Sequence, residues 1–297
     1  MEMSSEKQQL PKPKRRWFQL RLRTLLVLVT LASVFLGWVG WELDQRRREK
    51  VAIAWVEKMG GEVTFGSVEK GGFPSETSWW KKTKDTLFGK SVQSFTLSGD
   101  EVTDLSPLAG LKNLESLCVS YMQVSDLSPL TELTNLETLD FRRTVVSDVT
   151  PLAGLKKMRT LNLSSTEVSD LNPLVELKGL WILSFNNTQV SDLTPLAGME
   201  SLAQLQLSKT KVRDLSPLAK LKSLFQLHLD DTQVNDLTPL AQLKYLSELS
   251  LARTEVSDLS PLAGLQNLRS LNLNGTNVTK EQIDQLQLAL PNCEITR

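Results

Sequence analysis

Histidine and cysteine are almost missing from this sequence of 297 residues. His228 is the single histidine, which excludes most histidine-based metal sites and catalytic triads. The two cysteines, Cys118 and Cys293, are too few for a disulfide framework or a metal cluster. Because no nucleophile with a neighbouring base is identifiable either, we expect no catalytic site, no cofactor, no metal and no small-molecule substrate.

An excess of basic charge is also missing, because 34 Lys and Arg side chains balance 34 Asp and Glu side chains. The balance hides an asymmetry. Residues 1–41 carry seven basic and two acidic side chains, whereas residues 42–297 carry 27 basic and 32 acidic side chains. A mildly acidic body argues against a nucleic-acid partner, which requires a basic face.

One long apolar run, TLLVLVTLASVFLGWVGW, occupies residues 24–41. Its uncharged residues would span about 27 Å as a helix, close to the hydrocarbon thickness of a bilayer. Seven basic residues precede it, among them Lys12, Lys14, Arg15, Arg16, Arg21 and Arg23. The positive-inside rule therefore predicts a single-pass anchor in the cytoplasmic (inner) membrane, with the N-terminus in the cytoplasm and the remainder in the periplasm or outside the cell.

Two alternatives to this transmembrane helix remain. A cleaved signal peptide would also have a basic start, but no small-x-small cleavage site follows the apolar run. Bulky Trp38 and Trp41 stand where that site would lie. A buried helix of a soluble protein is disfavoured by the flanking charge.

The strongest pattern in the chain is a repeat of 22 residues, LxxLxLxxTxVSDLSPLAGLKN. Its prolines are Pro107, Pro129, Pro151, Pro173, Pro195, Pro217, Pro239 and Pro261. Leucines at this spacing predict an α/β solenoid of the leucine-rich-repeat type, a right-handed coil with a parallel sheet on its concave face. In the first full coil we expect seven side chains to point inward: Leu114, Leu117, Val119, Val124, Leu127, Leu130 and Leu133.

Polar positions of the repeat predict the convex side. A Ser, Thr or Asn before each proline suits a helix N-cap, so each coil should begin a short 3₁₀ or α segment there. An aspartate two residues earlier recurs eight times, from Asp104 to Asp258, and we interpret it as an acceptor for backbone N–H groups. A threonine column from Thr144 to Thr276 should bond the backbone between coils.

The ends of the repeat array carry different patterns. We expect a helix over 44–59, a short strand over 62–65, a helix over 79–88 and a first repeat strand over 92–97, giving nine repeat strands. At the other end we expect a longer helix over 279–290 and a closing strand over 291–295. The predicted parts are a basic cytoplasmic tail (1–23), a transmembrane helix (24–41), a juxtamembrane helix and cap (42–91), repeats (92–278) and a C-terminal cap (279–297). Cys118 and Cys293 should be free thiols, because eight coils separate them by roughly 38 Å.

The repeat VTDLSPLAGLKNLESLCVS and its successors resemble the 22-residue repeats of internalin-like bacterial leucine-rich-repeat proteins, over residues 92–297. The segment RLRTLLVLVTLASVFLGW, followed by VEKMGGEVTF, resembles a membrane-anchored bacterial subset of these proteins. The resemblance implies a curved solenoid that binds other proteins through its concave strand face.

Two outward columns of the strands do not repeat, so the fold does not dictate them. One runs Cys118, Asp140, Asn162, Ser184, Gln206, His228, Ser250, Asn272, and the other Ser116, Thr138, Thr160, Ile182, Gln204, Gln226, Glu248, Ser270. Trp181 and Phe225 begin their strands where other coils have charged residues, and exposed aromatics are typical interface anchors. The predicted partner-binding residues are Trp181, Ile182, Asn186, Phe225, Gln226, His228 and Asp230.

Three hypotheses concern what this surface does. We expect a protein-interaction module that binds a protein or peptide outside the cytoplasm; the alternative is a structural envelope or scaffold protein without a defined ligand. An enzyme would need a constellation that the sequence does not contain, and His228 should be a surface histidine with Asp230 as its hydrogen-bond partner. If Trp181 and Phe225 only pack on neighbouring loops, the edge where the strands end, with Arg142, Arg143, Asp230 and Asp231, is the other candidate surface.

Overall fold

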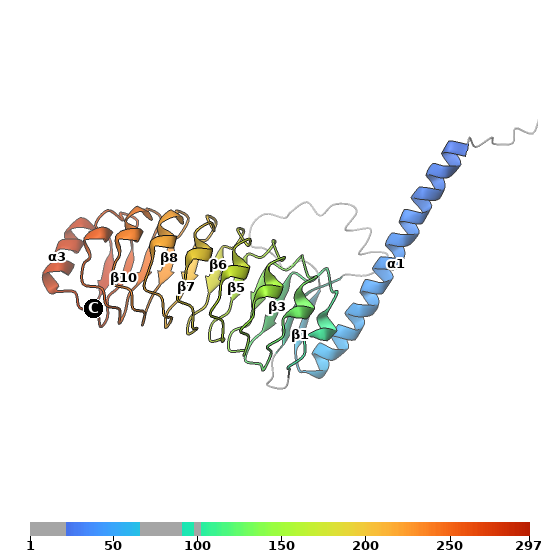
Figure 1. Ribbon diagram of the computed structural model, residues 1–297, viewed down its shortest axis with the longest axis horizontal. Coiled ribbons are helices and arrows are strands. Elements are labelled where there is room, and N and C mark those ends of the chain that lie inside the picture. Colours follow the sequence, from blue (N-terminus) through green and yellow to red (C-terminus); the bar gives the residue numbers. More distant parts are fainter. Residues whose placement is uncertain (1–21, 66–90, 98–101) are drawn as a thin grey trace, which may run out of the picture. The chain divides into compact units, whose positions relative to one another are not determined.

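The computed structural model describes residues 22–65, 91–97 and 102–297 (Figure 1). Most of the predicted basic tail and the whole predicted helix over 79–88 lie outside these residues. The chain divides into two compact units, residues 1–43 and residues 44–297.

Helix α1 (Leu22–Lys58) begins in the first unit as an apolar helix. Its large side chains there are exposed, including Leu31 at 62%, Val34 at 70% and Leu36 at 67%. Among the described residues it is the one helix that is long and apolar enough to cross a membrane. A helix that is apolar on every face requires either a protein core or lipid around it. The predicted helix over 44–59 forms the C-terminal part of α1, which ends at Lys58.

The second unit is the predicted solenoid, with one strand per coil. Parallel, in-register pairing joins β2 to β11, and β1 adds to β2 in the antiparallel sense. The nine predicted repeat strands are β2 (Val92–Leu97), β3 (Ser116–Val119), β4 (Thr138–Asp140), β5 (Thr160–Asn162), β6 (Ile182–Ser184), β7 (Gln204–Gln206), β8 (Gln226–His228), β9 (Glu248–Ser250) and β10 (Ser270–Asn272). The edge strands are β1 (Glu62–Phe65) and β11 (Glu294–Thr296).

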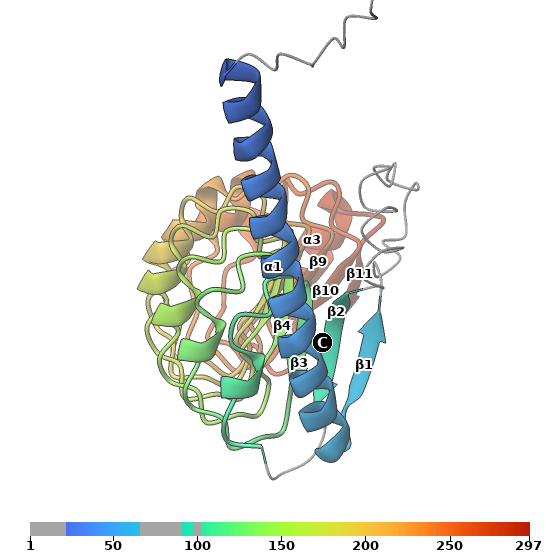
Figure 2. The ribbon, with the colours of Figure 1, turned by 90° about the vertical axis from the view of Figure 1, so that its right-hand side faces the viewer.

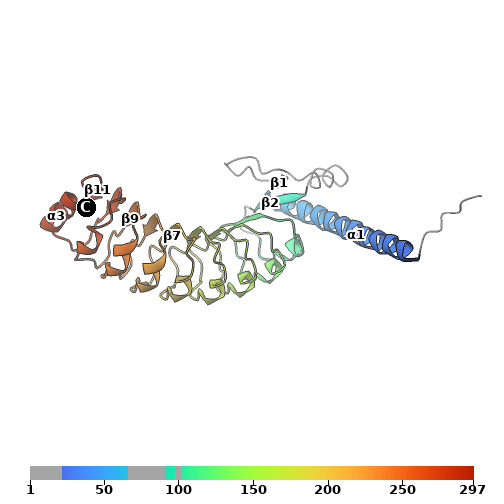
Figure 3. The ribbon, with the colours of Figure 1, turned by 90° about the horizontal axis from the view of Figure 1, so that it is seen from above.

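Short 3₁₀ segments occupy the side of each coil opposite to the strands (Figure 2). They are η1 (Ser106–Leu108), η2 (Ser128–Leu130), η3 (Thr150–Leu152), η4 (Asn172–Leu174), η5 (Thr194–Leu196), η6 (Ser216–Lys220), η7 (Thr238–Gln242) and η8 (Ser260–Leu262). Because a 3₁₀ segment is wider than a strand, the stack of coils curves, and the strands lie on its inner side (Figure 3).

The core of the solenoid is a column of leucines stacked coil on coil. All seven side chains predicted to point inward in the first full coil are at most 1% exposed. Full burial of each stabilises the fold by roughly 1.5–3 kcal/mol, and neighbouring coils provide that burial. Phe141 and Phe185 fill the same core position that Val119 fills in its coil, and both are fully buried.

The predicted N-cap role of the residue before each proline is wrong. Ser106, for example, is the first residue of η1, so the N-cap position falls on Leu105, whose side chain makes no capping hydrogen bond. Asp104 caps the segment instead, because its carboxylate accepts the Ser106 N–H at 2.7 Å and the Ser106 hydroxyl at 2.7 Å. A 3₁₀ turn this short leaves one free N–H within reach of a carboxylate two residues back. The same N–H bond occurs in all eight coils, which confirms the predicted role of the aspartates.

The threonine column also bonds differently from the prediction. Thr144 is buried, and its hydroxyl donates to the carbonyl of Phe141 at 2.8 Å, within the same coil. The other members repeat this bond. The hydroxyl points into the turn after the strand, where the nearest free carbonyl lies three residues back. Bonds between coils are made by the backbone there, as from Arg143 N–H to the Ser164 carbonyl at 2.9 Å.

Both ends of the array are covered. Ala52 and Val56, on the last turns of α1, are fully buried against the first coil. At the other end, α3 (Lys280–Ala289) begins with a capping box between Thr279 and Gln282, and β11 closes the sheet. The predicted closing strand is present but begins three residues later than expected, at Glu294. Cys118 and Cys293 are free thiols, as predicted.

Candidate interaction surface

The two outward columns of the strands form one continuous surface. The register pairs Ile182 with Gln204 and Gln206 with His228, so residues 22 apart lie side by side. Most of these side chains are half-buried, because each is flanked by the equivalent side chains of the adjacent coils. Successive members of a column are therefore about 4.8 Å apart, and a ligand of a few residues would touch several coils.

Trp181 and Phe225 lie on one long edge of this surface. We call it the strand-start edge, and it consists of the loops that join each 3₁₀ segment to the next strand. Ala203 N–H donates to the Trp181 carbonyl at 2.9 Å, and Phe225 N–H donates to the Ala203 carbonyl at 2.9 Å. Trp181 is 51% exposed, Phe225 is half-buried, and Ala203 between them is only 4% exposed. The two rings are thus held two coils apart, about 10 Å, by a continuous backbone ladder.

His228 lies in the middle of the surface, and its partner is not the predicted one. Its Nε2 is 2.9 Å from Glu248 Oε1 and 3.1 Å from Gln226 Nε2, whereas Asp230 bonds elsewhere. Glu248 is the register partner of Gln226 in the next strand, and the Asp230 carboxylate is occupied by the Ala252 N–H and two serine hydroxyls. Within the described residues no three His, Cys, Asp or Glu side chains are placed to hold a metal ion.

Asn186 and Asp230 are engaged in bonds between coils. Asn186 accepts from Ser208 N–H at 2.8 Å and donates to Gln206 Oε1 at 3.2 Å. Asp230 accepts from Ala252 N–H at 2.9 Å and from the hydroxyls of two serines in the neighbouring coils. These two predicted binding residues therefore also hold the strand-end turns in place, and a change at either would disturb the coil as well as the surface.

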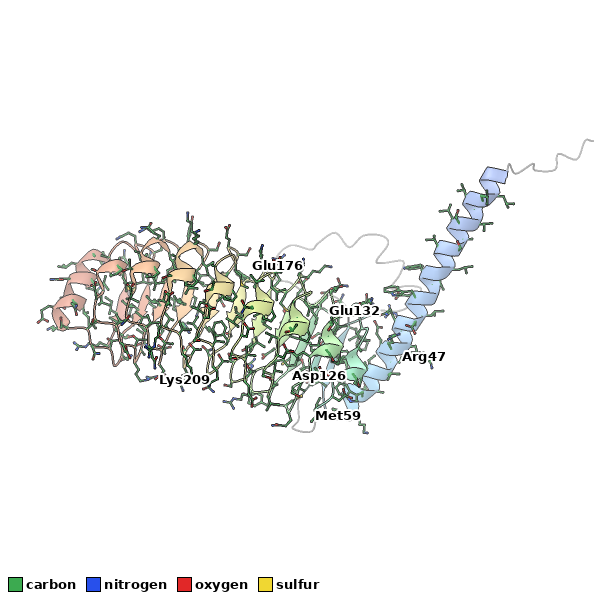
Figure 4. The ribbon with its side chains drawn as sticks, viewed as in Figure 1. Arg47, Met59, Asp126, Glu132, Glu176 and Lys209 are labelled. Atoms are coloured by element: carbon green, nitrogen blue, oxygen red, sulfur yellow. The ribbon has the colours of Figure 1, made fainter. Side chains whose placement is uncertain are left out.

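The opposite long edge, where the strands end, is largely self-paired. Arg142 forms an ion pair with Asp140 at 2.5 Å, and Arg253 forms one with Asp231 at 2.5 Å. The guanidinium of Arg143 lies 4.8 Å from the ring centre of Tyr121. Figure 4 shows Lys209 on this edge and Glu132 and Glu176 on the strand-start edge.

The sequence analysis missed one exposed aromatic of the strand-start edge. Tyr245 is 68% exposed and lies on the strand-start edge, one coil beyond Phe225. The repeat itself contained the signal, because the equivalent position holds Asn, Gly, Ser or Lys in the other coils. Trp181, Phe225 and Tyr245 thus share one edge.

Comparisons with known proteins give the family. No protein-family model and no curated protein matches the chain. An internalin (inlF) from Listeria monocytogenes is 34% identical, with a TM-score of 0.65 over 67% of this chain and 59% of its own. Internalin C2 (inlC2) from the same species is 34% identical, with a TM-score of 0.59 over 63% of this chain and 81% of its own. The chain belongs to the internalin-like leucine-rich-repeat family.

The internalin-like chain thus spans 59% of the length of the inlF structure. Its fold also matches the plant peptide hormone receptor RGFR1, whose structure is a complex with RGF2. That receptor is 18% identical, with a TM-score of 0.55 over 69% of this chain and 35% of its own, so it shares the fold alone.

Proposed function

We propose that this internalin-like chain is a membrane-anchored module that binds a protein or peptide partner through its concave face, outside the cytoplasm. The exposure of Trp181 carries the proposal, since a 51% exposed tryptophan at the edge of a non-repeating polar surface has no role in the leucine core. Large aromatic side chains at such positions are typical binding anchors. Ile182, Gln226 and His228 lie in the two strands that follow Trp181 and Phe225 and would supply the rest of the contact.

The anchor part of the proposal rests on the first unit. Most apolar side chains of α1 between residues 25 and 43 are exposed, and a bilayer is the environment that would cover them. The basic segment before the helix supports a cytoplasmic N-terminus, which would place the repeats on the other side of the membrane. RGFR1, which is solved with its ligand RGF2, shows that the same architecture can hold a peptide.

A cross-linking experiment tests the binding role. A photoreactive amino acid at position 182 should capture a partner from intact membranes, and the partner can then be purified for affinity measurements. Trp181→Ala combined with Phe225→Ala should weaken its binding by about 30-fold or more, because truncating a buried aromatic anchor costs roughly 2 kcal/mol.

Leu288→Ala provides the matched control. Leu288 is an apolar side chain on α3 that is 85% exposed, far along the chain from both aromatic anchors. Its truncation should leave affinity unchanged. If the aromatic double variant lowers the melting temperature but not affinity, the rings are packing groups, and a scaffold protein without a defined ligand becomes the better description.

A further inference from the structure

Between residues 153 and 259 the two long edges of the solenoid carry opposite charge, whereas the two preceding strand-start loops, 109–116 and 131–138, carry Lys112 and three glutamates. The contrast appears in the charges of five successive coils, whose strand-start loops are 153–160, 175–182, 197–204, 219–226 and 241–248. These loops carry seven basic and three acidic side chains. The strand-end loops of the same coils, 164–171, 186–193, 208–215, 230–237 and 252–259, carry four basic and nine acidic side chains. The neutral total of the chain thus conceals a basic edge and an acidic edge.

Most cationic side chains of the strand-start edge have no hydrogen-bond or ion-pair partner among the described residues. Arg159, Lys178, Lys220 and Lys222 are exposed, and within the described residues none of them forms a hydrogen bond or an ion pair through its side chain. Lys244 donates to the carbonyls of Ala241 and Gly264, at 2.9 and 3.3 Å, and so keeps its charge at the same edge.

The three acidic side chains of this edge are fewer than its seven cations and, within the described residues, form no ion pair with them. Glu176 and Glu200 are exposed, and Glu248 is turned toward His228. On the strand-end edge, by contrast, Arg253 is paired with Asp231, and the exposed Lys209 and Lys211 lie among nine acidic side chains of the same five coils. Free positive charge is therefore concentrated on the edge that also holds the aromatic anchors.

The apolar side chains of the same edge alternate with these cations. Trp181 is 51% exposed, Tyr245 is 68% exposed and Val175 is 46% exposed, and Phe225 lies half-buried between them. Tyr245 directly follows Lys244, and Phe225 comes three residues after Lys222. The distance along the stack from the coil of Arg159 to the coil of Tyr245 is four coil spacings, or about 19 Å. An extended peptide of about six residues has this length.

We propose that the strand-start edge binds an acidic, extended polypeptide segment that carries aromatic or large aliphatic side chains. The inference rests on the proposed binding function and specifies the chemistry of the partner. Carboxylates of the segment pair with the unused lysines, while its apolar side chains pack on Trp181 and Tyr245. Opposite charge at the edge also accelerates association and makes it sensitive to ionic strength.

The test uses the full chain in nanodiscs of uncharged phosphatidylcholine, panned against a displayed library of random twelve-residue peptides. Peptides that are enriched should contain an excess of Asp and Glu together with at least one aromatic or large aliphatic residue. Measured by fluorescence anisotropy, their affinity should fall at least tenfold between 50 and 300 mM salt, because surface charges are screened over about 10 Å at 0.1 M.

A matched pair of variants locates the binding. Lys220→Glu with Lys222→Glu should weaken the enriched peptides at least tenfold. Lys209→Glu with Lys211→Glu makes the same charge change on the strand-end edge of the adjacent coil and should leave affinity within twofold. Circular dichroism of both variants establishes that they are equally folded.

The remaining outcomes separate this inference from the proposed function. If uncharged or basic peptides are enriched and are lost in Trp181→Ala but not in Lys220→Glu with Lys222→Glu, the binding function stands and the acidic partner is overturned. Equal losses in the two charge-reversal pairs would also overturn it, because the effect would then reflect net charge alone. If no peptide is enriched above empty nanodiscs, both the acidic partner and the peptide-binding function are overturned.

Discussion

Each inward leucine touches only its own coil and the two neighbouring coils, because a solenoid has no other layer. Leu205 is fully buried in the middle of the array, whereas Gln204 beside it points outward and is half-buried. Adjacent residues of one strand thus have opposite environments, as the period-two geometry of a strand requires.

Leu205→Asp should lower the free energy of unfolding of residues 44–297 by about 4 kcal/mol, because a buried carboxylate without a partner is strongly unfavourable. Gln204→Asp should change it by less than about 0.5 kcal/mol. Urea denaturation followed by circular dichroism gives both values. Gln206 would be a poorer control, since its Oε1 accepts from Ser184 Oγ at 2.9 Å. Similar losses at Leu205 and Gln204 would contradict the observed strand phase.

A second residue-scale feature is a column with left-handed backbone conformation at the end of each strand. It comprises Tyr121, Arg143, Ser165, Asn187, Lys209, Asp231, Arg253 and Gly275, with φ between 54° and 71°. For residues other than Gly, Asn and Asp, this backbone conformation costs about 1 kcal/mol. The conformation directs each N–H to the next coil, as from Lys209 to the Asp230 carbonyl at 2.7 Å.

Lys209→Asn should therefore raise stability by about 0.5–1 kcal/mol, because asparagine adopts this conformation more readily than lysine. Lys211→Asn removes the same charge from the same edge at a residue without positive φ, and it should not stabilise the fold. Thermal denaturation of the two variants compares them directly. An equal rise in both would mean that charge, and not backbone strain, is responsible.

At the scale of elements, each 3₁₀ segment depends on one aspartate. Two hydrogen bonds lower the pKa of Asp104: the larger effect comes from the Ser106 hydroxyl and the smaller from the Ser106 N–H. The Thr or Ser two residues later lowers the pKa of four other aspartates in the same way, namely Asp148, Asp192, Asp214 and Asp236. A carboxyl group with a lowered pKa in the folded state favours folding when ionised. Its contribution is complete above its ordinary value near 3.8 and is lost as the pH falls through the lower folded value.

We expect Asp148→Asn, Asp192→Asn and Asp214→Asn together to flatten the loss of stability below about pH 4. The amide oxygen can still accept the backbone N–H, so the variant should remain folded at neutral pH. Urea midpoints between pH 2.5 and pH 7 measure the effect. Asp284→Asn, at an exposed aspartate of α3 that makes no hydrogen bond within the described residues, should leave the pH profile unchanged. A triple variant with the unaltered acid profile would show that these carboxylates are not the titrating groups.

At the scale of the whole molecule, the chain combines an apolar helix with a solenoid of mixed surface charge. The exposed apolar side chains of α1 would associate with one another in water, whereas the solenoid exposes mainly polar side chains. The two units therefore favour different surroundings, which is the basis for expecting an anchored protein.

Removal of residues 24–41 should transfer the protein from the membrane fraction to the soluble fraction, with its repeats still folded. The unaltered chain should resist extraction by alkaline carbonate and start before residue 24 on N-terminal sequencing. Protease added to spheroplasts should digest the repeats. A mature chain that starts near residue 42 would instead establish a cleaved signal peptide, and protection of the repeats until cells are opened would reverse the orientation.

The sequence alone determined the coil. Leucines at fixed positions of a 22-residue unit allow a single inward set, so strand phase, the convex segments and the aspartate column followed from pattern and propensity. Exceptions to the repeat, such as Trp181, were equally visible, because a repeat is its own alignment.

Only the tertiary structure decided which polar atoms meet. Whether the cap of η1 is Ser106 or Asp104, and whether His228 bonds Asp230 or Glu248, depends on differences of an ångström in the turns and between coils. Thr144 was assigned to the wrong carbonyl for the same reason. Likewise, the basic edge with Tyr245 exists only after coiling brings residues 22 apart to about 4.8 Å from one another. Hydrophobic burial tolerates such differences, but hydrogen bonds and ion pairs do not, and the partners of the surface groups were therefore beyond the sequence pattern.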